Sequence, residues 1–112
     1  MNVDRLERVA AYLEKLDFHL FDLDVAHNRN GRTCALGHLP NIFPEQFEYD
    51  HLQNVAVIGL LAKDPYELAE KFLDVSEIDT TYLFGSKSYA PGAGAKEVAM
   101  RIRMFIKMEK TL

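Results

Sequence analysis

The sequence predicts an α+β fold that is mainly helical, with four to five helices and a small β element, in one compact domain of residues 1–112. The length of 112 residues is sufficient for a single hydrophobic core. With 48% apolar and 27% charged residues, the composition is that of a folded protein rather than a disordered one. Apolar residues recur at helical spacing near both ends, whereas the middle is rich in turn residues and β-branched side chains.

The N-terminal part predicts one long helix followed by a strand. Residues 3–16 carry apolar side chains at three- and four-residue steps, with Asn2 or Asp4 as the N-cap. Residues 18–25 alternate in part between apolar and polar side chains, which favours a short strand. Asn30-Gly31 then predicts a tight turn, because both residue types tolerate positive φ.

The middle of the chain predicts a short helix and a strand. We expect the helix over residues 34–39, with Thr33 as its N-cap and Pro40 as its end. The run of Val, Ile and Leu at residues 54–61 favours a buried strand paired with residues 47–52. A short helix is the competing interpretation, because periodicity does not distinguish the two in so short a run.

The second half predicts three helices. Asp64-Pro65 begins the first, and Ser76 begins the second, which ends at Gly85. After a loop at residues 86–94, the last helix covers about residues 95–110. Its expected core stripe is Val98, Ile102, Phe105 and Ile106, and a second stripe at four-residue spacing is Met100, Met104 and Met108. We expect Met104 and Met108 to be partly exposed.

Charge is distributed unevenly along the chain. Residues 1–86 carry 15 acidic and 7 basic residues, a net charge of −8, whereas residues 87–112 carry 2 acidic and 6 basic residues, a net charge of +4. The basic terminal helix could meet the phosphates of a nucleic acid. We favour docking on the acidic body or plain solvation, because six basic residues with few aromatic residues among them are a weak signature of nucleic-acid binding.

Cys34 and His38 are the candidate catalytic residues. A thiol in the first turn of a helix has a lowered pKa, and a histidine four residues later lies on the same face. Such a pair could act as a thiol-dependent hydrolase or transferase, with Asp22, Asp24 or Asn28 orienting the histidine. The favoured interpretation is structural: a small buried cysteine and a hydrogen-bonded histidine in a short core helix.

No metal or cofactor is expected. His27, Cys34, His38 and His51 match no standard zinc spacing, and residues 22–31 lack the pattern of a calcium loop. Residues 86–96 are Gly-rich and contain lysines but do not form a P-loop motif, so a connecting loop is favoured over a phosphate site. With one cysteine, no signal peptide and no apolar run that could span a membrane, the expected location is the cytoplasm.

Four short segments occur in an order that points to a family. They are residues 34–38 (CALGH), 69–76 (AEKFLDVS), 82–89 (YLFGSKSY) and 98–106 (VAMRIRMFI). In these segments the chain resembles a diffuse family of small bacterial and phage-encoded proteins of unknown function. The resemblance implies a shared small domain and a phage or mobile-element setting, and it transfers no catalytic residue.

These observations predict a non-catalytic protein that acts by binding another macromolecule, as a phage or prophage accessory factor. The expected partner is an unidentified protein; a homodimer and direct nucleic-acid binding are the alternatives, and no membrane contact is expected. The expected contact residues lie on the terminal helix, where basic and methionine side chains offer a surface. They are Arg101, Arg103, Met104, Lys107 and Met108.

Overall fold

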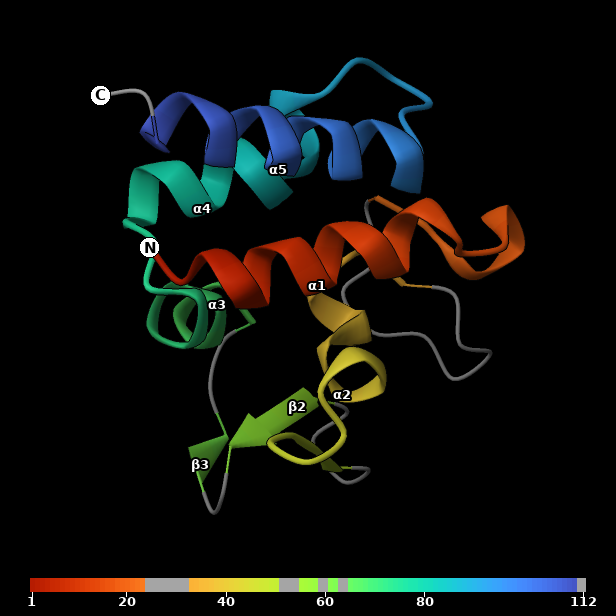
Figure 1. Ribbon diagram of the computed structural model, residues 1–112. Coiled ribbons are helices and arrows are strands. Elements are labelled where there is room, and N and C mark those ends of the chain that lie inside the picture. Colours follow the sequence, from red (N-terminus) through yellow and green to blue (C-terminus); the bar gives the residue numbers. More distant parts are fainter. Residues whose placement is uncertain (24–32, 51–54, 59–60, 63–64, 111–112) are drawn as a thin grey trace.

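A computed structural model describes residues 1–23, 33–50, 55–58, 61–62 and 65–110 of the chain (Figure 1). Its α-helices are α1 (Val3–Glu14), α2 (Leu39–Ile42), α3 (Pro65–Leu73), α4 (Glu77–Phe84) and α5 (Ala95–Lys110). Its strands are β1 (Glu48–Asp50), β2 (Val55–Ile58) and β3 (Leu61–Ala62). Short 3₁₀ turns are η1 (Phe18–Leu20), η2 (Leu36–His38) and η3 (Ser86–Ser88). The predicted helix at residues 95–110 is confirmed.

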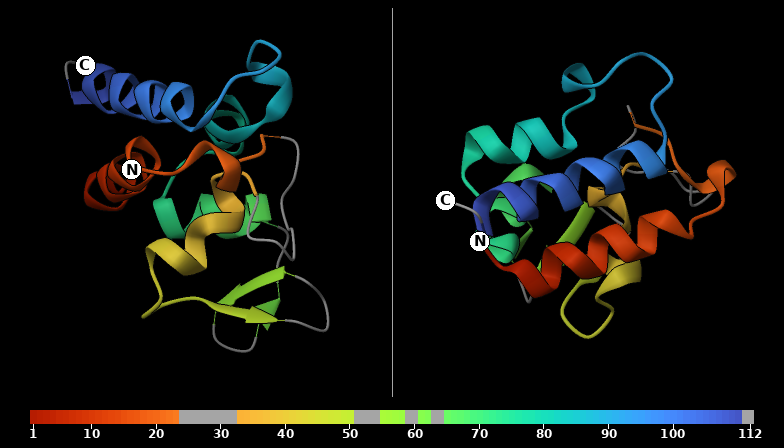
Figure 2. Two further views of the ribbon diagram at one scale, coloured as in Figure 1. Left: turned by 90° about the vertical axis from the view of Figure 1, so that its right-hand side faces the viewer. Right: turned by 45° about the horizontal axis from the view of Figure 1, so that its top comes forward.

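Helix α1 lies in the middle of the molecule. Figures 1 and 2 show α5 and α4 on one side of α1, and α2, α3 and the strands on the other. Helix α5 runs antiparallel to α1, since Arg103 pairs with Glu14 (2.6 Å) and Lys110 lies 3.7 Å from Glu7. Leu6, Val9, Ala10 and Leu13 of α1 and Val98, Ala99, Ile102 and Ile106 of α5 are buried in one core. The predicted apolar stripes of both helices therefore face each other.

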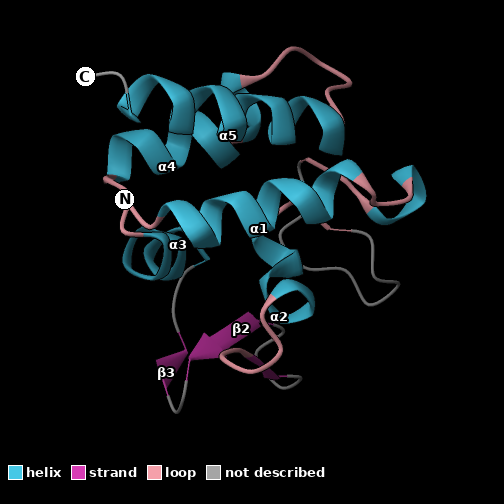
Figure 3. Cartoon of the chain, viewed as in Figure 1, coloured by secondary structure: helices cyan, strands magenta, loops and turns pink. Residues whose placement is uncertain are grey.

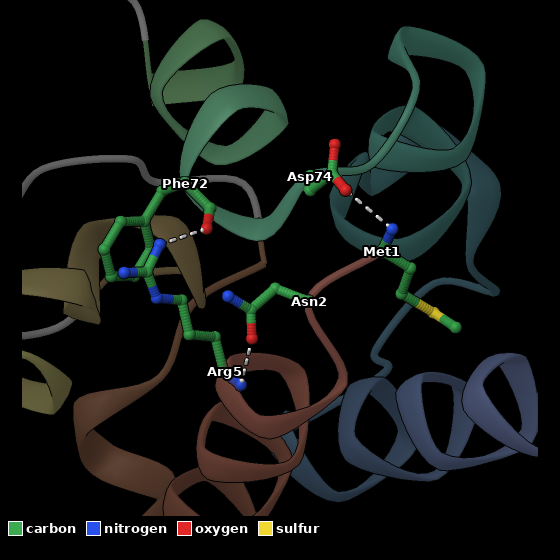
Figure 4. Close-up of polar contacts among 5 residues, drawn as sticks. All are labelled: Met1, Asn2, Arg5, Phe72 and Asp74. Carbon is green, nitrogen blue, oxygen red and sulfur yellow. Dashed lines mark hydrogen bonds and ion pairs between the residues drawn. The ribbon is translucent and has the colours of Figure 1, made fainter.

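The start of α1 is fastened to the end of α3 (Figure 4). Asn2 caps α1 by accepting a hydrogen bond from the backbone N–H of Arg5 (3.0 Å). The Arg5 guanidinium donates to the carbonyl of Phe72 (2.8 Å) and lies over its ring, 4.0 Å from the centroid. The amino group of Met1 pairs with Asp74 (2.9 Å), which has a positive φ of 55°. These contacts hold α3 against α1.

Helix α4 begins and ends where the sequence predicts. The hydroxyl of Ser76 accepts from the backbone N–H of Asp79 (3.1 Å), which confirms it as the N-cap. At the other end, a Cβ on Gly85 would lie 2.6 Å from the carbonyl oxygen of Thr81. Glycine is therefore required by a close backbone approach, and not by a positive φ, since φ is −74° there.

The α+β class is corrected to a mainly helical fold. Helices form most of the described chain, and the strands are only three, four and two residues long (Figure 3). They pair antiparallel in the order β1-β2-β3, with Tyr49 opposite Ala56 and Val57 opposite Ala62. The strand predicted within residues 54–61 and its pairing with residues 47–52 are confirmed by β2 and β1, but strands this short do not form a layer that covers a core.

Two further local predictions are wrong. Residues 18–20 form the 3₁₀ turn η1 rather than a strand, because the Asp17 carboxylate caps the turn at the N–H of His19 (2.9 Å). The helix expected over residues 34–39 is instead η2 followed by α2, and Pro40 lies in the first turn of α2. Proline is tolerated in a first turn, where its missing N–H is not needed. The predicted turn at residues 30–31 lies outside the described residues.

Candidate functional site

Cys34 and His38 are both buried in the segment that contains η2. Cys34 has 7% and His38 has 1% of its surface exposed. The predicted cap by Thr33 is not formed: η2 begins after Ala35, and no side chain caps it. Burial raises the pKa of the Cys34 thiol, although hydrogen bonds from the backbone of Gly37 and Leu36 and from Thr33 oppose this in part. The thiol is therefore held in its protonated, less nucleophilic form.

The imidazole of His38 is engaged at both nitrogens. Nε2 donates to the carbonyl oxygen of Leu20 (2.7 Å), and Nδ1 accepts from the side-chain amide of Asn41 (3.1 Å). Its ring also packs 5.5 Å from that of Tyr12. Burial lowers the pKa of His38, and the bond to Leu20 opposes this in part. A neutral histidine with both nitrogens occupied fastens η1 to α2 and offers no base to a thiol.

The candidate metal and calcium sites of the sequence are not found in the described residues. His27 and His51 lie outside them, as do Asp24, Asn28 and most of the calcium-loop stretch. Within the part of the chain that is described, no three His, Cys, Asp or Glu side chains gather as metal ligands. Across the same residues, no helix combines the length and apolar character that crossing a membrane requires.

Arg101 is a structural clamp within the molecule. Its Nη1 lies within hydrogen-bond distance of the carbonyl oxygens of Tyr82 (2.9 Å) and Ser88 (2.8 Å) and of the Ser88 hydroxyl (3.0 Å). Its guanidinium lies over the rings of Tyr82 (4.5 Å) and Tyr89 (3.7 Å). Burial raises the pKa of Tyr89 to about 12, and its hydroxyl donates to Leu83. Arg101 thus fixes η3 between α4 and α5, and its Nη1 donors are used within the molecule.

Arg103 also forms its hydrogen bonds within the molecule. Its Nε and Nη2 donate to the two carboxylate oxygens of Glu14, at 2.6 and 2.8 Å. These hydrogen bonds lower the pKa of Glu14 and raise the pKa of Arg103. The expected docking of the basic helix on the acidic body is found at this pair. Two of the five predicted contact residues are therefore internal contacts of the fold.

The methionine ridge, defined as Met100, Met104 and Met108, is the exposed apolar feature of α5. The three side chains have 63%, 57% and 64% of their surface exposed. Because they are four residues apart, they lie in a row along the helix, opposite the buried stripe. The prediction that Met104 and Met108 are exposed is confirmed. Methionine rows of this kind adapt to varied apolar partners.

An acidic groove lies along one side of the ridge, between α4 and α5. Its volume is about 600 Å³, and all three methionines line it together with Tyr82, which is exposed on α4. Its carboxylates are Asp79, Glu97 and Glu109, and its only described cation is Arg101. Because three carboxylates outnumber the one guanidinium, the groove presents an apolar floor with a net acidic rim.

A basic groove lies along the other side of the ridge, between α5 and α1. Its volume is about 470 Å³, and it shares Met100 and Met104 with the acidic groove. Its cations are Lys96, Lys107 and Arg103, and Arg103 is paired with Glu14 on the same wall. The ridge therefore separates two rims of opposite charge.

No local sequence pattern brings the carboxylates of the acidic rim together. Asp79 and Tyr82 are 18 or more positions before Met100, so only the packing of α4 beside α5 brings them to the ridge. Glu97 does have a local signal, its position three residues after Gly94: its carboxylate accepts from the N–H of Gly94 (2.9 Å) and caps α5. That carboxylate therefore occupies the helix end where a phosphate could sit. Comparisons with protein families, curated proteins and solved structures find no match to this chain.

Proposed function

We propose that this chain is a non-catalytic protein that binds a helical segment of another protein in the acidic groove. The observation that carries the proposal is the methionine ridge beside an acid-rimmed hollow of about 600 Å³. An amphipathic helix places apolar side chains at i, i+4 and i+8, the same spacing as the ridge. Lysine or arginine beside that stripe would meet Asp79, Glu97 and Glu109.

The partner chemistry follows from charge. The acidic groove holds three carboxylates and one guanidinium, that of Arg101, whose Nη1 already donates within the molecule. A basic amphipathic helix complements this rim, whereas a nucleic acid would face repulsion from the same carboxylates. The thiol-dependent alternative lacks a favouring observation, because Cys34 is buried and His38 is occupied.

The biological setting of the proposal is a phage or prophage accessory factor in the cytoplasm. The first part rests on the resemblance of four short segments to small bacterial and phage-encoded proteins of unknown function, and the single cysteine supports a reducing compartment. An accessory factor of this kind would act by occupying a helix that its partner otherwise uses.

A designed peptide tests the function. The probe is a synthetic amphipathic helix of about 16 residues with a leucine stripe flanked by lysines, and its matched control replaces each lysine with glutamate. By calorimetry, we expect the basic peptide to bind at least about tenfold more tightly than the acidic one. Met104→Asp should abolish binding, whereas Lys71→Glu, on exposed α3 surface away from the groove, should leave it unchanged. Equal affinity for both peptides, or no binding by either, would contradict the proposal.

A further inference from the structure

Helix α5 itself carries the apolar row and the lysines that the acidic groove is proposed to bind. Its solvent-facing row of methionines is flanked on the α1 side by Lys96 and Lys107, which are both exposed. On the α4 side the same row is flanked by Glu97 and Glu109, with Arg101 between them in the sequence and held against Tyr82 and Ser88. The helix therefore presents an apolar ridge with a basic margin and an acidic margin, and each margin complements the other.

Two-fold symmetry decides how two such ridges can meet. If the axis runs along the helices, two copies of α5 lie parallel, and the acidic margin of one copy faces the basic margin of the other. Such an axis also keeps equal residues at equal heights. With a rise of ~1.5 Å per residue, Glu97 lies within ~1.5 Å of the height of the second copy's Lys96, and Glu109 within ~3 Å of the height of its Lys107.

The antiparallel arrangement brings like charges together. An axis perpendicular to the helices, centred at Met104, places each acidic margin against the acidic margin of the other copy. Glu97 and Glu109 lie seven and five residues from Met104. Their heights then differ by ~3 Å, so carboxylate faces carboxylate. Charge thus selects the parallel pairing.

We infer that a second copy of this chain occupies the methionine ridge, so that the protein forms a parallel two-fold dimer through α5. The inference rests on the proposed function, because it uses the same ridge and acidic groove. The dimer seats the basic margin of one α5 against the acidic rim of the other, so it competes with a partner helix. The interface of a single helix pair is small among protein interfaces, so we expect a weak dimer that is populated only at high protein concentration.

Charge exchange between two variants tests the dimer. Sedimentation of the full chain from about 1 µM to about 1 mM measures the association constant of the wild type. Glu97→Lys with Glu109→Lys gives a chain with two basic margins, and Lys96→Glu with Lys107→Glu gives one with two acidic margins. We expect each variant alone to associate at least about tenfold more weakly, and their equimolar mixture to recover wild-type association as a heterodimer. Thermal melting of each variant establishes that it is folded.

The outcomes separate this inference from the proposed function. The dimer is supported if the wild type dimerises, each variant alone loses the dimer and the mixture recovers it. A Met104→Lys variant should also be monomeric, because it places two cations at the two-fold axis. A wild type that stays monomeric, or a dimer that neither exchange weakens, overturns the inference. A monomer that still binds the basic peptide overturns the dimer alone, whereas a dimer that the basic peptide cannot dissociate overturns the proposed function.

Discussion

Replacing Arg101 tests whether its charge holds the fold together. Of the three oxygens around Nη1, two can accept its two hydrogens at one time. A hydrogen bond to a charged group contributes ~1.5 kcal/mol at the low end of its range, and stacking on tyrosine adds ~0.5–1 kcal/mol. Water can reach the freed carbonyls in part, so we expect Arg101→Met to lower the free energy of unfolding by ~2 kcal/mol.

Urea denaturation followed by circular dichroism measures this change. For a chain of 112 residues, ~2 kcal/mol corresponds to ~8 °C in melting temperature. Lys107→Met is the matched control, because Lys107 lies exposed on the same helix, and it should change stability by less than ~0.5 kcal/mol. If Arg101→Met were as stable as this control, the clamp would be wrong and Arg101 would again be a candidate contact for a partner.

Three further predictions concern titration and reactivity. Burial lowers the pKa of His38, so the free energy of unfolding should fall as the pH drops below ~6.5 toward the pKa of the folded state, by at most ~1.4 kcal/mol per pH unit. Urea denaturation at successive pH values measures this dependence, and His38→Gln should remove it. Cys34 should react with a thiol reagent at least about a hundredfold more slowly in the native protein than in urea, and equal rates would contradict its burial. In carbon-detected NMR titrations, Glu14 should titrate below its usual range, and Arg103→Met should return its pKa toward the ordinary value; an unchanged titration would argue against the pair.

The helices were predictable because their signals are local. Ser76 caps α4 through its own third neighbour, and the apolar steps of residues 95–110 define the buried stripe of α5 without reference to other parts of the chain. The fold class failed at residues 54–61, where β-branched composition indicates strand formation but not how much sheet the fold contains. The predicted helix end at Pro40 was wrong because proline can either end a helix or stand in its first turn, according to its position.

The candidate site was only half predictable. The exposed methionines follow from the period of one helix, since a second stripe remains when the first faces the core. The contacts of the two arginines do not follow from that period. Arg103 pairs with Glu14, which is 89 residues away in the sequence, and Arg101 reaches Ser88 only because the loop before α5 brings Ser88 close. Pairing across such separations depends on tertiary packing, which no local pattern specifies. The acidic rim was missed for the same reason.

Methionine methyl groups offer the most direct test of the binding surface. The chain contains four methionines, so labelling their ε-methyl carbons gives four NMR signals, and the three of the ridge are exposed in one row. Titration with the basic amphipathic peptide should shift the signals of Met100, Met104 and Met108, while that of Met1, which does not line the groove, serves as the internal control. Shifts that are absent, or that the acidic peptide reproduces, would contradict the proposed binding surface.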